Sequence, residues 1–196
     1  MSDPYVYPGT NVLINKYGIR DQDRLEIAER LLVFERLIEP TPNIALTYEG
    51  YQALHHHLFQ DVYDWAGKPR NVDMAKADSL FCRAPYIDSE MEKRFALLKE
   101  QKFLKGLRAQ RFARYAAEHI SEINAIHPFR EGNGRTQQLF LDVLADQAGH
   151  RFNRALIKHD PWNEASKASF RGDYAPMVQV IETGMRERRR DRDRER

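Results

Sequence analysis

The sequence predicts a mainly helical, all-α protein with one small β-hairpin. Apolar residues recur at intervals of three and four through most of the chain, which is the period of a helix. Several of these runs begin at a capping residue and end at glycine or before proline. One segment, residues 70–81, breaks the period. At 196 residues the chain is long enough for one domain with a full hydrophobic core, and we expect that domain to span residues 1–185.

Two helices are predicted in the first third of the chain. Residues 21–38 carry leucine, alanine and isoleucine at helical spacing, and the run stops before Pro40. Thr47 is a good cap for a second helix, whose apolar residues include Leu54. We expect this second helix to reach Gly67, because glycine commonly ends a helix.

Residues 70–81 are predicted to form a short β-hairpin or an extended flap. Val72 and Met74 stand in alternation, a polar turn follows, and Leu80 and Phe81 come next. Because an isolated hairpin is only marginally stable in water, this one should rest on the helical body.

The rest of the chain is predicted to hold five further helices, recognised by the same apolar period and by caps, glycines or prolines at their ends. They start at residue 88 or 89, cover residues 108–126 and 135–148, start at residue 160, and begin near residue 174.

The composition is typical of a soluble globular protein, with 42% hydrophobic and 31% charged residues. The 31 basic and 29 acidic residues leave a formal net charge of +2, which argues against a dedicated nucleic-acid binder. No stretch approaches the roughly 18 consecutive apolar residues of a membrane span. Residues 186–196 are all charged and cannot pack on a core, so we expect a disordered tail.

The N-terminus has neither the basic nor the apolar region of a classical secretory signal. The single cysteine, Cys82, cannot form an internal disulfide, which fits a reducing compartment. We therefore expect a cytoplasmic protein, with a secreted effector lacking a classical signal peptide as the alternative.

The segment from His127 to Arg135 carries the strongest chemical signal. It reads His-Pro-Phe-Arg-Glu-Gly-Asn-Gly-Arg and joins the end of one predicted helix to the start of the next. Gly132, Asn133 and Gly134 are expected to form a tight turn that aims backbone N–H groups, and the positive end of the second helix, into one small space. Glycines permit positive φ angles and a close approach of phosphate, and Asn133 adds a side-chain amide donor. The turn therefore predicts a phosphate-binding site.

The residues beside this turn suit the transfer of a phosphate-containing group. Glu131 offers a hard oxygen ligand for Mg²⁺, which is typically held by one or two carboxylates plus substrate phosphates. Arg135 can bind phosphate oxygens bidentately. Histidine is suited to removing a hydroxyl proton near neutral pH, so His127 is the candidate base. Phe129 is expected to point inward and anchor the loop. A chance turn between helices would explain the glycines but none of these four residues.

Three consecutive histidines, residues 55–57, invite a metal-site interpretation. Successive residues of a helix point about 100° apart, so these three cannot converge on one ion. We expect them to be structural, at the surface and the edge of the core. His119 lies on the apolar face of its helix and is expected to be a core residue.

The segment His127–Arg135 resembles the Fic motif, His-x-Phe-x-(Asp/Glu)-Gly-Asn-Gly-Arg-x-x-Arg. The resemblance extends to Tyr7-Pro-Gly-Thr10, to residues 58–67 and to the flap. These segments are similar to those of the compact bacterial Fic toxins. It implies a single, mostly helical Fic domain that uses Mg²⁺ and ATP. It also implies the activity, transfer of AMP to a hydroxyl side chain of a target protein.

The same resemblance implies a role for each matching residue. His127 would deprotonate the target hydroxyl, and Glu131 would hold Mg²⁺ that bridges the α- and β-phosphates. The Gly132-Asn133-Gly134 turn would cradle those phosphates, and Arg135 would bind the leaving pyrophosphate. The flap would pair with an extended target segment and set its hydroxyl opposite His127. The flap residues in question are Val72, Asp73, Met74, Ala75 and Lys76.

One position departs from the motif, because Gln138 replaces the second arginine. In Fic proteins that arginine binds the γ-phosphate and pairs with an inhibitory glutamate. Losing a charged contact of this kind typically costs about 1.5–3 kcal/mol. Gln138 remains a candidate nucleotide-binding residue, and three alternatives stay open: slowed AMP transfer, transfer of another phosphate-containing group, or a binding module that keeps the loop as an anion site.

The family's inhibitory element reads (Ser/Thr)-x-x-x-Glu-(Gly/Asn), and no segment of this sequence matches it. The nearest, Thr183 to Glu187, is followed by Arg188. The resemblance therefore implies a separate small antitoxin protein as a second partner beside the target protein. Neither a membrane nor a specific nucleic acid is expected as a partner.

Overall fold

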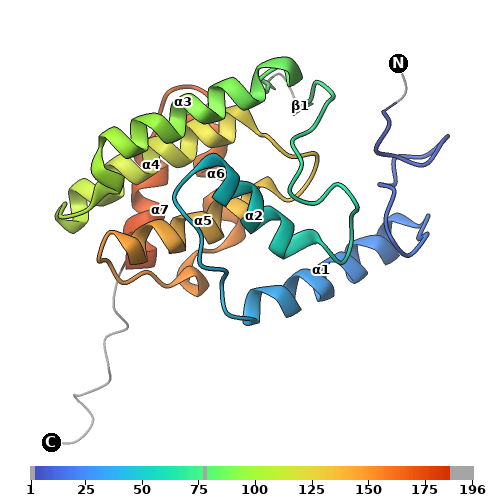
Figure 1. The fold of residues 1–196 in the computed structure, drawn as a ribbon, viewed down its shortest axis with the longest axis horizontal. Helices are drawn as coiled ribbons and strands as arrows, with labels where there is room; N and C mark the ends of the chain where they lie inside the picture. Colours follow the sequence, from blue (N-terminus) through green and yellow to red (C-terminus); the bar gives the residue numbers. More distant parts are fainter. Residues whose placement is uncertain (1–2, 77–78, 186–196) are drawn as a thin grey trace, which may run out of the picture.

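The computed structural model describes residues 3–76 and 79–185, and these are mostly helical (Figure 1), so the predicted fold class is confirmed. Three short 3-10 turns, η1 to η3, accompany the α-helices within that range. The helices are α1 (Gln22–Ile38), α2 (Tyr48–Phe59), α3 (Ile87–Glu100), α4 (Ala109–Ile126), α5 (Asn133–Gln147), α6 (His159–Ser169) and α7 (Ala175–Met185); the 3-10 turns are η1 (Ala84–Tyr86), η2 (Lys102–Leu104) and η3 (Arg154–Leu156).

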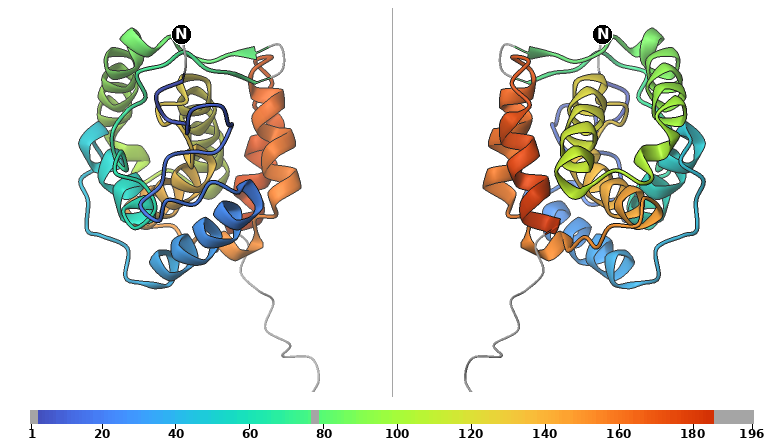
Figure 2. Two further views of the ribbon diagram at one scale, coloured as in Figure 1. Left: turned by 90° about the vertical axis from the view of Figure 1, so that its right-hand side faces the viewer. Right: turned by 90° about the vertical axis from the view of Figure 1, so that its left-hand side faces the viewer.

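Helix α4 lies at the centre of the bundle. It contacts α3, α5, α6 and α7, and Figure 2 shows α6 and α7 on one side of it and α3 on the other. Its buried residues recur at helical spacing and include Phe112, Ala116, Ile120 and Ile123. A fully buried phenylalanine or isoleucine contributes roughly 1.5–3 kcal/mol. The packing on several sides fixes α4 as a rod whose C-terminal end presents residue 127.

Helix α1 begins after Asp21, the first residue of the predicted segment, which is its N-cap and whose carboxylate accepts a backbone N–H of the first turn at 2.9 Å. The helix packs on α2, and an ion pair between Arg36 and Asp61, at 2.6 Å, holds its C-terminal half in place. Leu31 and Ile38, which helped to predict this helix, are 60% and 69% exposed. The apolar period therefore identified the helix but not its buried face.

Helix α2 begins after the predicted cap, Thr47, but it ends at Phe59 rather than at Gly67. The N–H groups of Val62 and Tyr63 both donate to the carbonyl of Phe59, at 2.9 and 3.0 Å, so the chain leaves the helix in a tight turn. Gly67 has a φ of +83° but lies in a second turn, residues 64–67, beyond the end of the helix. The predicted end was wrong because the turn buries Val62 and Tyr63 as completely as another helical turn would.

The flap holds less regular structure than a full hairpin. Its strands, β1 (Ala75–Lys76) and β2 (Ser79–Leu80), pair antiparallel over two residues each. Residues 77 and 78, and the side chain of Lys76, lie outside the described part of the chain. The predicted alternation is visible in the burial: Val72 and Met74 are half-buried, whereas Asp73 and Ala75 are exposed.

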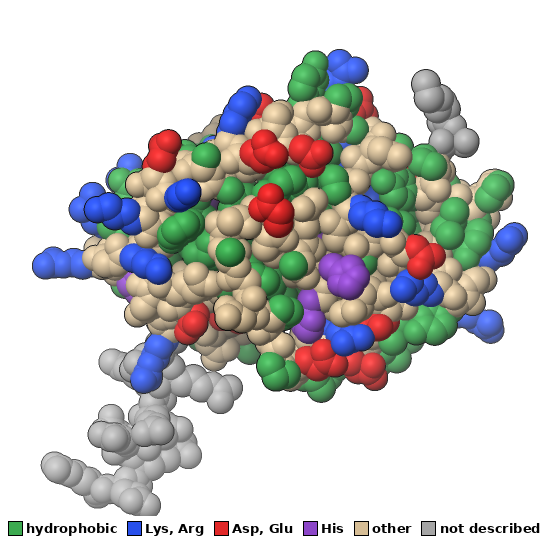
Figure 3. All heavy atoms as spheres, viewed as in Figure 1, with side chains coloured by type: hydrophobic (Ala, Val, Ile, Leu, Met, Phe, Trp, Pro, Cys, Tyr) green, Lys and Arg blue, Asp and Glu red, His purple; other side chains and the backbone are tan. Residues whose placement is uncertain are grey.

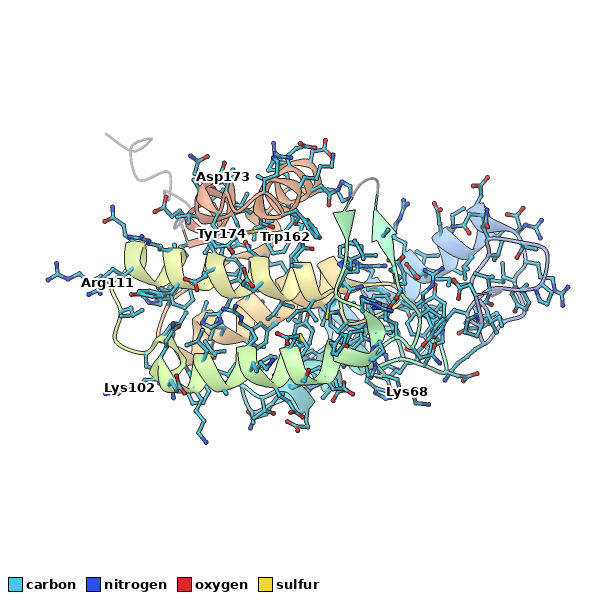
Figure 4. All side chains as sticks on the ribbon, turned by 90° about the horizontal axis from the view of Figure 1, so that it is seen from above. Lys68, Lys102, Arg111, Trp162, Asp173 and Tyr174 are labelled. Carbon is cyan, nitrogen blue, oxygen red and sulfur yellow. The ribbon has the colours of Figure 1, made fainter. Side chains whose placement is uncertain are left out.

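The flap rests on the helical body at the end of α4, as expected. Figure 4 shows α3 and α4 side by side, with the two strands near the end at which α4 finishes. The N–H of Cys82, just after the flap, donates to the carbonyl of Ala125 at 3.1 Å. Phe81 is 4% exposed and packs there as well.

Charged side chains of both signs are interspersed over the face shown in Figure 3, in keeping with the net charge of +2. None of the described helices combines the length and the apolar character needed to cross a membrane. The charged segment 186–196, predicted to be a disordered tail, lies outside the described residues.

Candidate active site

His127 ends α4 in the left-handed region, with φ and ψ of 52° and 63°. Its imidazole stacks on the ring of Phe81, with ring centroids 3.8 Å apart. Its Nδ1 lies 3.3 Å from the carbonyl oxygen of Asn124. Because a carbonyl oxygen can only accept, the proton belongs on Nδ1, and Nε2 is the basic nitrogen of the ring.

Asn133 closes the loop that follows His127. Its Oδ1 accepts the N–H of Phe129 at 3.0 Å, and its Nδ2 donates to the carbonyl of the same residue at 2.8 Å. Both ends of this amide are therefore used inside the loop, and its donation to a ligand stays a prediction, because the amide nitrogen has two N–H donors and the loop uses one. Phe129 is fully buried and stacks on Tyr51 and His55, so it anchors the loop as predicted.

The two glycines of the loop differ in conformation. Gly132 has a φ of +82°, and a Cβ at this position would lie 2.2 Å from the ring of Phe59. Gly134 lies inside α5, and a Cβ there would meet Trp162 Nε1 at 3.7 Å, an ordinary contact. The prediction that both glycines need special backbone angles is therefore correct for Gly132 and wrong for Gly134.

Helix α5 begins at Asn133, two residues before the predicted start at Arg135. Gly132 is its N-cap, and no side chain caps the helix. The first N–H groups of a helix have no partner within it, and they carry the positive end of the helix dipole. The backbone N–H groups of Asn133, Gly134 and Arg135 therefore offer the donors that bind anions at helix N-termini, whereas the N–H of Gly132 is donated to Glu131.

Glu131 has a side chain that is 46% exposed. Its Oε1 accepts the N–H of Gly132 at 2.8 Å and lies 3.3 Å from Nη2 of Arg135. Within residues 3–76 and 79–185, no group of three or more His, Cys, Asp and Glu side chains could hold a metal ion. One accessible carboxylate nevertheless fits Mg²⁺, which takes the rest of its ligands from phosphates and water.

Arg135 is bound by carboxylates from two different elements. Its Nη2 donates to Oε1 of Glu29, on α1, at 2.7 Å, in addition to its contact with Glu131. Its guanidinium carbon lies 4.7 Å from the centroid of the Phe59 ring. Glu29 also accepts the hydroxyl of Tyr63. Burial and the charge of Glu29 raise the pKa of Tyr63, so this phenol stays protonated and donates.

Gln138 is half-buried on α5, three residues beyond Arg135. Residues three apart share a helical face, so Gln138 lies on the side of α5 that carries Arg135. Gln138 is therefore not simply exposed to solvent.

Arg70 connects the flap to the loop and was missed by the sequence reasoning. It is 2% exposed, and its backbone N–H donates to the carbonyl of Pro128 at 2.8 Å. A guanidinium has five N–H donors in a fixed planar fork, which suits several acceptors at once. Here it donates to the backbone carbonyls of His127 at 2.9 Å, Val72 at 2.5 Å, Cys82 at 2.6 Å and Ile126 at 3.2 Å.

His55 supports the loop from α2 and was likewise not singled out. Its Nδ1 accepts the N–H of Gly67 at 2.8 Å, so Nε2 carries the proton and donates to the carbonyl of Glu131 at 3.0 Å. Burial lowers the pKa of His55 to about 3. The three consecutive histidines are structural, as predicted, but one of them directly holds the candidate active-site loop.

Acid is expected to destabilise the fold through His55 and His119. Burial lowers their pKa values from 6.5 to about 3 and about 4, respectively. Below pH 6.5 the unfolded chain gains these protons while the folded protein does not, so stability that is present above pH 6.5 is lost on acidification. Each histidine should account for a loss of about 2 kcal/mol by pH 5.

Urea unfolding at pH 7, 6 and 5 measures this loss. His55→Asn removes one titrating group, so the free energy of unfolding should fall less steeply with acidification in the variant, whatever its value at pH 7. An identical slope in both proteins would show that folding does not hold His55 neutral.

Known proteins are similar to this chain over nearly its whole length. The sequence model of the family described as Fic/DOC matches residues 45–145. A probable protein adenylyltransferase of Sinorhizobium fredii is 41% identical over 182 residues, which cover 92% of this chain and 95% of that protein. The probable protein adenylyltransferase Fic of Escherichia coli is 35% identical over 181 residues, with 91% and 90% covered. The structure of the effector BepC from Bartonella tribocorum, with bound AMPPNP, has a TM-score of 0.83 at 28% identity and covers 94% of this chain and 97% of its own.

Proposed function

Because this chain belongs to the Fic/DOC family, we infer that it is a protein adenylyltransferase, which transfers AMP from ATP to a hydroxyl side chain of a target protein. The relatives named as probable adenylyltransferases match it over nearly their full lengths. The AMPPNP bound in a structural relative supports a nucleoside triphosphate as donor. One observation above all others supports the placement of the site. The loop that Asn133 closes by hydrogen bonds joins His127, whose tautomer is fixed, to the start of α5, which no side chain caps.

We propose His127 as the general base. The target hydroxyl oxygen attacks the α-phosphorus of ATP, and a new P–O bond forms while the bond to pyrophosphate breaks. Nε2 of His127 takes the hydroxyl proton. The contact of Nδ1 with Asn124 and the stacking on Phe81 fix the ring, so that positioning is provided before the target binds.

We propose that the start of α5 binds the triphosphate. The backbone N–H groups of Asn133 and Gly134, and that of Gly132 when Glu131 releases it, would hold phosphate oxygens, and Arg135 would bind the leaving pyrophosphate. Glu131 would hold Mg²⁺, which when bound offsets part of the negative charge of the triphosphate.

We propose that the flap binds the target as an added strand. Main-chain groups of residues 72–76 would pair with an extended segment, and the half-buried Val72 and Met74 alternate with exposed neighbours as this mode requires. Arg70 keeps the flap next to the His127 carbonyl. A separate small antitoxin protein remains the proposed regulator, since these 196 residues contain no match to the inhibitory pattern.

The position of the label on ATP provides the direct test. The purified protein is incubated with a cell lysate and with ATP labelled either at the α- or at the γ-phosphate. Label from the α-position alone should appear on a protein band, because AMP is transferred and pyrophosphate leaves. Label from the γ-position would instead indicate phosphorylation, and label from neither would remove the support for a transferase and favour a binding module.

Gln138→Arg is expected to raise AMP transfer by roughly tenfold to a hundredfold, the size of one hydrogen bond to a charged group. An arginine on the Arg135 face of α5 would contact the γ-phosphate and orient the triphosphate. It would also give an antitoxin glutamate a partner, so inhibition in trans should become stronger. The initial rate of α-label incorporation by the two proteins, side by side, measures the first effect.

Gln138→Leu is the control for this change, because it alters the side chain without adding charge and should not speed transfer. If Gln138→Arg gains no rate while ATP still binds, another side chain has taken over the role of the arginine, or ATP is not the donor.

A further inference from the structure

We propose that Glu29, on α1, is a positioning residue that holds the Arg135 side chain ready for the pyrophosphate group. The proposal rests on the proposed function, in which Arg135 binds the leaving group. Glu29 lies outside the motif, 106 residues before Arg135, and connects the first helix of the domain to the phosphate site.

Glu29 is itself rigidly held. Its side chain is 12% exposed, and its two carboxylate oxygens have different donors, Nη2 of Arg135 at 2.7 Å and the hydroxyl of Tyr63. Helix α1 cannot easily shift, because Arg36 pairs with Asp61 through two hydrogen bonds, at 2.6 and 2.9 Å. The carboxylate is therefore a fixed point to which the guanidinium is attached.

The arginine needs such an anchor because its place is electrostatically unfavourable. Arg135 lies in the first turn of α5, where the helix dipole repels a cation. Its side chain is 33% exposed, so without Glu29 it is free to turn toward solvent. The contacts with Glu29 and with the Phe59 ring keep it beside the uncapped amides instead.

A carboxylate beside an anion site can also compete with the anion for the donors of the arginine. The geometry argues against such competition by Glu29. Nη2 alone makes the bonds to Glu29 and Glu131. Among the described residues, Nε and Nη1 of Arg135 donate no hydrogen bond. These two groups can therefore donate to a phosphate while Nη2 stays bound to Glu29. An anchored arginine also does not have to lose its rotamer freedom when the anion arrives.

Pyrophosphate itself is the probe, because its binding does not depend on transfer. Calorimetry with the full chain compares wild type, Glu29→Ala, Glu29→Gln, Arg135→Ala and the double variant. Glu29→Ala should weaken pyrophosphate binding about tenfold, the effect of releasing an arginine side chain. Glu29→Gln should bind nearly as wild type, because its amide oxygen accepts from Arg135 and its amide nitrogen donates to the oxygen of Tyr63.

The double variant separates positioning from general damage. If Glu29 acts through Arg135, then Glu29→Ala adds no loss once Arg135 is alanine. Glu26→Ala, exposed on the same helix, is the matched control and should bind as wild type. The proposal is overturned if Glu29→Ala binds pyrophosphate as tightly as wild type or more tightly, or if its effect persists unchanged without Arg135.

The outcome for Glu29 is distinguishable from the outcome for the enzyme. A wild-type protein that binds pyrophosphate but transfers no AMP would refute the proposed function, while the variant series still decides the role of Glu29. A wild-type protein that binds neither pyrophosphate nor ATP would refute both.

Discussion

Replacing His127 by alanine is expected to slow AMP transfer by a factor of roughly 10²–10⁴, the range that positioned general bases contribute. The affinity for ATP should change little, because the base acts on the target hydroxyl and not on the phosphates. Initial rates of α-label incorporation and Kd values for ATP, measured on the same preparations, separate the two quantities.

His127→Asn is the second variant, because asparagine tolerates the left-handed backbone at this position, where φ is 52°. It should be as inactive as the alanine variant and at least as stable. His56→Ala, exposed on α2, is the histidine control and should keep full activity. Equal losses of ATP binding and of turnover in His127→Ala would instead assign the residue a structural role.

Gly132→Ala is expected to impair both stability and nucleotide binding. A side chain at a φ of +82° costs about 1–2 kcal/mol, and overpacking a filled space about 1–3 kcal/mol, so a loss of about 2–5 kcal/mol is expected. The new Cβ would lie 2.2 and 2.3 Å from two atoms of the Phe59 ring. That ring is fully buried and also carries Arg135 over its face, so its displacement disturbs the phosphate site. Urea unfolding and ATP calorimetry measure the two effects.

Gly134→Ala is the matched control within the same motif. Its Cβ would meet the nearest atom at 3.7 Å, and alanine is favoured over glycine inside a helix by up to about 1 kcal/mol. The free energy of unfolding should therefore stay the same or rise. Equal losses of stability in both variants would contradict the distinction that the structure makes between the two glycines.

The helices beside the candidate active-site loop, and the turn that joins them, could be predicted because their signals are local. The apolar period identifies the helices, and Gly132 marks a sharp turn before α5. The part that Asn133 plays in closing the loop could not be derived in this way. It depends on the closeness of both backbone groups of Phe129, which a single sequence does not reveal.

The residues that support the site were not predictable from one sequence for a different reason. His55, Arg70 and Glu29 find their partners 76, 57 and 106 residues away, and nothing in the residue type or its spacing encodes those partners. The contacts of Glu29 and His55 exist because α1 packs on α2 and α2 packs on α5, whereas Arg70 contacts the end of α4. Each of these three side chains therefore looks, in the sequence, like an ordinary surface or core-edge residue.

The Arg70 guanidinium fixes the distance between the flap and His127. This distance is therefore a property of this protein and not of its target. One planar group donates to the carbonyl of Val72 and to the carbonyl of His127, so it links the flap directly to the loop. A serine or threonine hydroxyl lies one bond beyond Cβ, whereas a tyrosine hydroxyl lies across an aromatic ring. If the flap binds the target as proposed, the paired strand would bring only one of these lengths to Nε2 of His127. The length of the acceptor side chain would then help to select the residue that is modified.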